Sequence, residues 1–170
     1  DIYIEGEFIK KIGVDLKFDN EMKIIDGNGR IAIPGMIDDQ VHFREPGLTH
    51  KGDISSESKA AIAGGVTSYF EMPNTFPNTT SRKEFKKKIQ IASKNSFANF
   101  SFMFGGTNDN IDEIKKLDNK DVAGIKLFLG SSTGKMLIDN KDSIEKIFKS
   151  SSLPISAHCE DEQTIKDNTE

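Results

Sequence analysis

Residues 35–65 read GMIDDQVHFREPGLTHKGDISSESKAAIAGG. The stretch begins with a short run rich in apolar residues over 35–43 and then passes through a polar loop that contains a Pro-Gly turn. Over 52–65 the apolar residues recur near helical spacing. The pattern therefore predicts a strand followed by a helix, which is the repeating unit of α/β proteins.

The same alternation continues toward the C-terminus. Further strands are predicted over 67–72, 98–105, 123–130 and 153–160, and further helices over 81–95, 110–120 and 141–150. Consecutive units without return hairpins imply a parallel sheet, either open and doubly wound or curling toward a barrel. Periodicity alone leaves both architectures open, and in both the active site lies at the carboxyl ends of the strands.

Residues 1–32 have a different pattern. The runs DIYIEGEFIKKIG (1–13) and MKIIDGNGRIAI (22–33) are β-rich and are separated by Asp, Asn and Gly turn signals. They predict a small antiparallel β element before a main domain over 33–170. Because the sequence starts with Asp and ends in what resembles the start of a helix, we expect a fragment of a longer protein.

The composition of the chain argues against two classes of binding partner. Lys and Arg total 23 against 27 acidic residues, and the net charge of −4 gives no reason to expect nucleic acid or an anionic membrane surface. No apolar run approaches the roughly 18 residues of a membrane span, and no secretory signal is present. The single cysteine, Cys159, fits a reducing compartment and is expected to fill the core. We expect a cytoplasmic protein with a small-molecule substrate, and a homo-oligomer stays open.

Polar side chains gather at the predicted strand ends. His42 and Arg44 follow the first strand, Asn74 the second, and His158 the fifth. A single histidine at a strand end is more often a structural residue than a ligand. Two imidazoles with a carboxylate-like oxygen, however, suit a hydrolytic zinc ion.

Lys126 is the most unusual of these residues, because it lies inside the apolar run GIKLFL (124–129). Lysine is rarely fully buried without a partner. Either Lys126 is paired with a carboxylate, or its amine is chemically altered. A lysine that has reacted with carbon dioxide would present a carboxylate to a metal and would bury no unpaired ammonium.

Four motifs carry a resemblance to a known family. PGMIDDQVHFREPG, GGVTSYFEMPNT, GIKLFLGSSTG and AHCED, in this order from about residue 30 to 161, resemble the dihydroorotases of the amidohydrolase superfamily. The resemblance implies a partial (β/α)8 TIM-type barrel with about five of the eight units, preceded by strands of a small β-sandwich. It also implies zinc-dependent interconversion of N-carbamoyl-L-aspartate and (S)-dihydroorotate in de novo pyrimidine biosynthesis.

The resemblance also implies roles for single residues. His42 would be a metal ligand, a carboxylated Lys126 would bridge two metals, and His158 would be a ligand of the second metal, with one or two Zn²⁺ ions bound. Arg44 and Asn74 would bind the substrate. The general base is expected beyond residue 170, so no catalytic base is assigned in this chain.

Gln40 departs from the family pattern. The family has His-x-His on the first strand, and here Gln40 occupies the first histidine's position, on the same side of the strand as His42. A neutral amide is the poorer zinc ligand. The site could therefore hold one metal, use Gln40 weakly, or recruit Asp38 or Asp39.

Two alternative functions follow. Gln40 favours a noncatalytic dihydroorotase-like scaffold or partner protein, although the other ligands are retained. A hydantoinase-type or allantoinase-type cyclic amidase is the second alternative. Arg44 and Asn74 argue instead for a substrate that carries a ring carboxylate.

Overall fold

The structure is a computed structural model that describes residues 1–17, 19, 22–118, 120–130 and 136–169. It divides into two units, Asp1–Pro34 and Gly35–Glu170. Residues 131–134 of the motif GIKLFLGSSTG lie outside the described residues. No helix in the described ranges is long and apolar enough to cross a membrane.

The first unit contains a β-hairpin. Strands β1 (Ile2–Glu5) and β2 (Phe8–Ile12) pair antiparallel, and Gly6 takes a positive φ of 61° in the turn between them. The second predicted run, 22–33, forms no strand where the structure describes it. Its β-branched residues are exposed, for example Ile31 at 88%, so no packing partner stabilises a strand there. The β-sandwich assignment stays a prediction.

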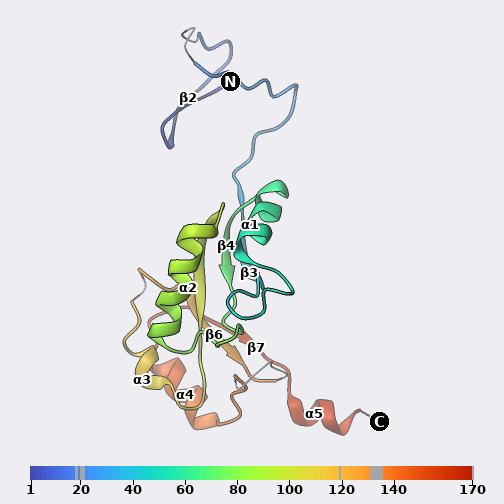
Figure 1. The fold of residues 1–170 in the computed structure, drawn as a ribbon, viewed down its shortest axis with the longest axis vertical. Helices are drawn as coiled ribbons and strands as arrows, with labels where there is room; N and C mark the ends of the chain where they lie inside the picture. The colour runs from blue at the N-terminus through green and yellow to red at the C-terminus, as the bar shows by residue number, and fades with distance from the viewer. Residues whose placement is uncertain (18, 20–21, 119, 131–135, 170) are drawn as a thin grey trace. The chain divides into compact units, whose positions relative to one another are not determined.

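The second unit is built on a parallel sheet. Its five strands are paired in sequence order. They are β3 (Met36–Val41), β4 (Val66–Glu71), β5 (Asn99–Gly105), β6 (Gly124–Phe128) and β7 (Ile155–His158). The sheet is a half-barrel, so the predicted partial TIM-type barrel is confirmed (Figure 1).

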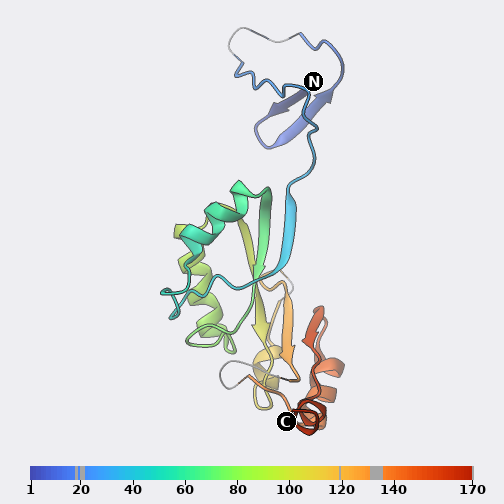
Figure 2. The ribbon, with the colours of Figure 1, turned by 90° about the vertical axis from the view of Figure 1, so that its right-hand side faces the viewer.

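Helices alternate with these strands. They are α1 (Ile54–Ala63), α2 (Arg82–Asn95), α3 (Ile111–Ile114), α4 (Lys141–Ser150) and α5 (Glu162–Asp167). Figure 2 shows α1 and α2 side by side along one side of the sheet. Ser81 caps the start of α2, because its hydroxyl accepts the Glu84 N–H.

Helix α3 is much shorter than the predicted 110–120. The side-chain oxygen of Asn110 accepts the Thr107 N–H, so it does not cap the helix. At the other end the Asp118 carboxylate accepts the Lys120 N–H, a local bond that competes with helical backbone pairing. Both short polar side chains favour turns over a longer helix.

The hydrophobic core lies between the sheet and the helices. Phe102 and Phe104 of β5 are fully buried, and the Phe85 ring of α2 lies 6.2 and 6.4 Å from theirs. Ile125 and Leu127 of β6 belong to the same cluster. Because side chains alternate along a strand, Lys126 points to the opposite face, toward the inside of the half-barrel. Cys159 is exposed, so its prediction as core filler was wrong.

Tyr69 of β4 gives a test of this core at high pH. Its hydroxyl donates to the Ser96 Oγ at 3.1 Å, and burial raises the pKa of Tyr69 to about 12. Below pH 10 its stabilising contribution is complete. As pH rises from about 10 to 12, the unfolded chain loses a proton that the folded chain keeps, so stability falls. Over this pH range we expect the free energy of unfolding of Tyr69→Phe to decrease by about 2 kcal/mol less than that of wild type.

The measurement is urea unfolding of the intact protein at pH 9 and near pH 12, compared between wild type and Tyr69→Phe. Identical pH dependence in the two proteins would show that Tyr69 ionises as readily in the folded state as in the unfolded chain.

Candidate active site

The predicted site residues come from three of the parallel strands and the loops after two of them. Gln40 lies on β3 and His42 follows its last residue, whereas Asn74 lies in the loop after β4. Lys126 lies within β6, and His158 is the last residue of β7. These positions agree with the general location of active sites in barrels.

The side chains of Gln40 and Lys126 meet. The Lys126 amine donates to the Gln40 Oε1 at 3.2 Å, although β3 and β6 are separated by β4 and β5 in the sheet. Such a contact is possible because the sheet curls, which brings inward-facing side chains of distant strands together. The residue that replaces the family's histidine therefore lies directly against the predicted carboxylated lysine.

Lys126 is buried, with 3% of its surface exposed, and burial lowers the pKa of its amine. Its Nζ lies 5.4 Å from the centroid of the Phe128 ring. Among the described residues, no carboxylate forms an ion pair with it. A neutral amide and an aromatic ring therefore take the place of the carboxylate expected beside a buried lysine. Carboxylation of Lys126 stays a prediction.

His42 lies close to the predicted substrate-binding residues. The Asn74 side chain lies near its imidazole. Partial burial lowers the pKa of His42, and the positive charges of Arg44 and Lys126 lower it further. The neutral imidazole is the form that binds a metal ion.

His158 is held by two neighbours. Its Nε2 lies 2.9 Å from the Glu160 carboxylate, and its ring stacks on Phe128 at a centroid distance of 6.3 Å. Phe128 and His158 are also register partners in the β6–β7 pair. The same aromatic ring thus contacts both His158 and the amine of Lys126.

The loops that carry Arg44 and Asn74 are bonded to each other. The Phe76 N–H donates to the Pro46 carbonyl at 3.0 Å. Arg44 has a φ of 71° and Gly47 a φ of 84°, both in the left-handed region. A Cβ on Gly47 would lie 1.8 Å from the Phe76 carbonyl oxygen. Only glycine fits where the two loops touch.

We therefore expect Gly47→Ala to destabilise the protein by at least about 2 kcal/mol more than Gly65→Ala. Gly65 is the matched control, because its φ is also positive at 91° but a Cβ there has no atom within 4 Å. The two variants share the backbone cost and differ in the clash. Chemical denaturation measures both, and equal destabilisation would contradict the tight contact between the loops.

A buried ion pair beneath these loops was not predicted from the sequence. The Lys88 Nζ lies 3.0 Å from the Glu71 Oε2, and both side chains are essentially inaccessible to solvent. Lys88 lies in the charged run KEFKKK, which is typical of a solvated helix face. The one available signal is its spacing of three from the buried Phe85, which places it on the inner face of α2.

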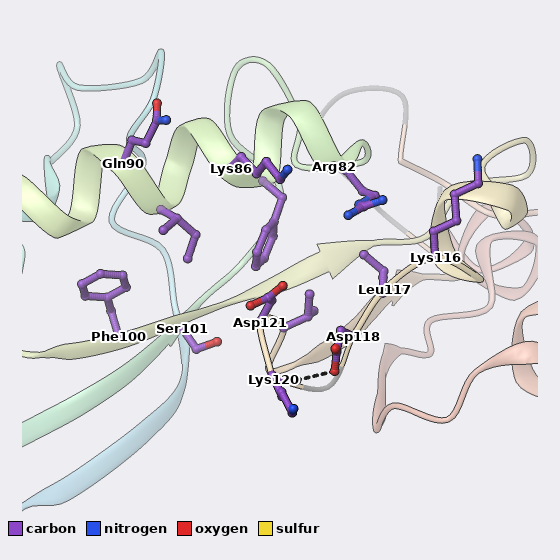
Figure 3. Close-up of a pocket in the computed structure, with 13 residues that line it drawn as sticks. Arg82, Lys86, Gln90, Phe100, Ser101, Lys116, Leu117, Asp118, Lys120 and Asp121 are labelled. Carbon is purple, nitrogen blue, oxygen red and sulfur yellow. Dashed lines mark hydrogen bonds between the residues drawn. The ribbon is translucent and has the colours of Figure 1, made fainter.

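A separate cavity lies away from these residues. Its volume is about 540 Å³, and it lies between α2, the start of β5 and the segment that precedes β6 (Figure 3). Phe100 and Ser101, near the amino end of β5, line it together with Arg82 and Lys86. None of the predicted site residues contributes to it, because these lie toward the carboxyl ends of the strands.

The candidate ligand residues suit a metal ion only if Lys126 is carboxylated. The described residues contain no cluster of three His, Cys, Asp or Glu side chains that could hold a metal ion. Two imidazoles from His42 and His158 leave a third donor to be supplied, and a carboxylated Lys126 would supply an anionic oxygen. With that modification the residues fit zinc.

Comparison with known proteins identifies the family of the chain. The family model described as dihydro-orotase-like matches residues 29–169. The chain belongs to the dihydroorotase-like family. A dihydroorotase of Methanosarcina mazei is 37% identical to this dihydroorotase-like chain over 166 residues, which cover 96% of the chain and 36% of that protein.

Other cyclic amidases are similar as well. An allantoinase of Desulfitobacterium hafniense is 35% identical over 154 residues, covering 87% of the chain and 34% of that protein. The solved L-hydantoinase of Arthrobacter aurescens superimposes with a TM-score of 0.79 at 28% identity, covering 88% of the chain and 35% of that structure. The dihydroorotase-like chain thus spans about a third of the length of these relatives.

Proposed function

We propose that this chain is part of a zinc-dependent cyclic amidohydrolase that interconverts N-carbamoyl-L-aspartate and (S)-dihydroorotate in the cytoplasm, in pyrimidine biosynthesis. The observation that carries the proposal is the joining of the Arg44 and Asn74 loops beside His42. A cationic guanidinium, an amide and an imidazole then lie next to one another. This set matches a substrate with a carboxylate and a cyclic amide.

Each of these side chains has a separate task. The Arg44 guanidinium would bind the ring carboxylate with two parallel hydrogen bonds. The Asn74 amide offers a donor and an acceptor to the ring amide, which fixes the orientation of the substrate. Because Asn74 lies near His42, the bound substrate would lie beside the metal site.

His42, Lys126 and His158 would hold the zinc ion, with Lys126 carboxylated. Zinc at this position supplies Lewis-acid activation of water and of the amide carbonyl. The Glu160 carboxylate lies 2.9 Å from the His158 Nε2 and would orient the imidazole for a metal ion. The Phe128 ring stacks on His158 and lies 5.4 Å from the Lys126 amine, so it packs beside both residues.

The test is turnover by the intact protein, expressed from its complete gene and loaded with zinc. We expect hydrolysis of dihydroorotate, and much weaker hydrolysis of hydantoin and allantoin, which lack the ring carboxylate. Preferred turnover of either of those two substrates would overturn the assignment in favour of a hydantoinase or an allantoinase.

Arg44→Met probes the substrate preference directly. Loss of a charge-assisted bidentate pair costs about 1.5–3 kcal/mol, so the KM for dihydroorotate should rise roughly 10-fold to 100-fold. Arg82→Met is the control, because Arg82 lines the separate cavity beside α2. If Arg44→Met leaves KM unchanged, Arg44 does not bind the carboxylate.

A noncatalytic protein is the second candidate, and the bond between Lys126 and Gln40 favours it. This contact occupies the amine that would have to carry the carboxylate. A folded, zinc-loaded protein without turnover of any of the three substrates would support this reading. The sequence of the sixth and eighth barrel strands gives a cheap check, since a histidine and an aspartate at their ends favour the enzyme.

A further inference from the structure

A chain of polar contacts runs from α2 to both substrate-binding loops. Lys88 donates from Nζ to the Met72 carbonyl at 2.9 Å and forms its ion pair with Glu71 at 3.0 Å. The other Glu71 oxygen, Oε1, accepts the backbone N–H of Arg44 at 3.0 Å. Met72 lies two residues before Asn74. One buried pair therefore contacts the backbone of both loops.

A contribution to stability does not by itself account for this buried pair. Burying two charges costs several kcal/mol, and an apolar pair of similar volume is often at least as stabilising. Lys88 has 0% of its surface exposed, and so has Glu71. Burial raises the pKa of Glu71 to about 6 and lowers the pKa of Lys88. What apolar side chains could not supply is the directional bonds to Arg44 and Met72.

The backbone of Arg44 needs such a bond. Its φ of 71° is left-handed, a conformation that costs a non-glycine residue about 1 kcal/mol or more. Its N–H points to the Glu71 carboxylate and forms a charge-assisted bond there. Glu71 thus stabilises the conformation that sets the direction of the Arg44 side chain.

The end of β4 is fixed from two sides as well. The Met72 N–H donates to the Val41 carbonyl at the end of β3, while the Met72 carbonyl accepts from Lys88. The Phe102 ring lies 5.2 Å from the Lys88 Nζ and limits where the amine can go. The segment that leads to Asn74 therefore starts from a fixed backbone.

We propose that Glu71 and Lys88 form a positioning pair that holds Arg44 and Asn74 at the spacing that one substrate molecule requires. The inference rests on the proposed function for the identity of the substrate. Neither residue touches the substrate in this proposal, since both act through the backbone of the loops.

Two matched double variants of the intact protein test it. Glu71→Gln with Lys88→Met removes both charges but keeps an oxygen that can accept the Arg44 N–H. Glu71→Met with Lys88→Met removes the charges and the acceptor. We expect the first variant to keep the KM for dihydroorotate within about threefold of wild type, and the second to raise it at least about tenfold with a smaller change in kcat.

Amide hydrogen exchange over residues 42–47 gives a readout that does not need a substrate. The Arg44 amide should stay protected in the Gln–Met variant and lose protection in the Met–Met variant. Equal protection in the two variants overturns the proposal, and so does equal KM when wild type is active. If wild type does not turn over dihydroorotate, the proposed function fails and the exchange result alone decides on the positioning pair.

The single variant Lys88→Met tests the proposal if the double variant Glu71→Met with Lys88→Met does not fold. It keeps the Glu71 acceptor and removes the bond to Met72. Exchange should then rise over 72–76 and stay low at Arg44. Unchanged exchange over 72–76 would show that Lys88 does not hold this segment.

Discussion

Replacing Lys126 by alanine is expected to lower turnover of dihydroorotate by more than about 10³-fold and to remove zinc from the intact protein. In the proposed site the three ligands are His42, His158 and the carboxylated Lys126. Two imidazoles alone form an incomplete zinc site, and structural and catalytic zinc ions have at least three protein ligands. Metal content by mass spectrometry and kcat/KM with dihydroorotate measure the two effects.

Two further variants make this result specific. Lys126→Gln cannot react with carbon dioxide and should fail as completely as Lys126→Ala, whereas Lys59→Ala, on the exposed face of α1, should behave as wild type. Retention of zinc by Lys126→Ala would exclude the lysine as a ligand. The bond to Gln40 would then be its structural role.

The second large effect concerns the number of metal ions. We expect wild type to bind one zinc ion per chain and Gln40→His to bind two. The imidazole is a stronger zinc ligand than a neutral amide, and the substitution restores the family's pattern beside His42. It also removes the Gln40 oxygen that accepts from the Lys126 amine.

Gln90→His is the matched control, because Gln90 is exposed on α2 and adds an imidazole far from the strand ends. Zinc titration followed by metal analysis gives the stoichiometry. Two zinc ions in wild type, or one in Gln40→His, would contradict the prediction. New turnover in Gln40→His from an inactive wild type would show that Gln40 alone separates a noncatalytic protein from an enzyme.

Sequence reasoning located the strands of the half-barrel well, because short β-rich runs alternate along the chain with longer, charged segments of helical periodicity. It failed where local polar side chains or missing partners decide the structure. Helix α3 ends early since Asn110 and Asp118 bond to nearby backbone groups. The run over 22–33 is β-rich, yet its large apolar side chains are exposed in the part of the chain that the structure describes.

The candidate site divides in the same way. Lys126 could be singled out because a lysine in GIKLFL is anomalous on its own. Its contact with Gln40 could not be predicted, since it depends on the curl of a sheet that periodicity leaves undetermined. Lys88 resembles its solvated neighbours in KEFKKK, and only the tertiary contact with Glu71 reveals its burial.

The alternation along β6 has a consequence for how such proteins change over generations. Ile125 and Leu127 hold the helices, while Lys126 between them faces the site. Substitutions on the inner face can therefore accumulate with little penalty to folding, and a descendant can exchange or abandon its chemistry while remaining a well-formed barrel. Gln40, which occupies the position of the family's histidine, is on this inner face. We expect it to change the amount of bound metal and to leave the thermal stability of the protein unchanged.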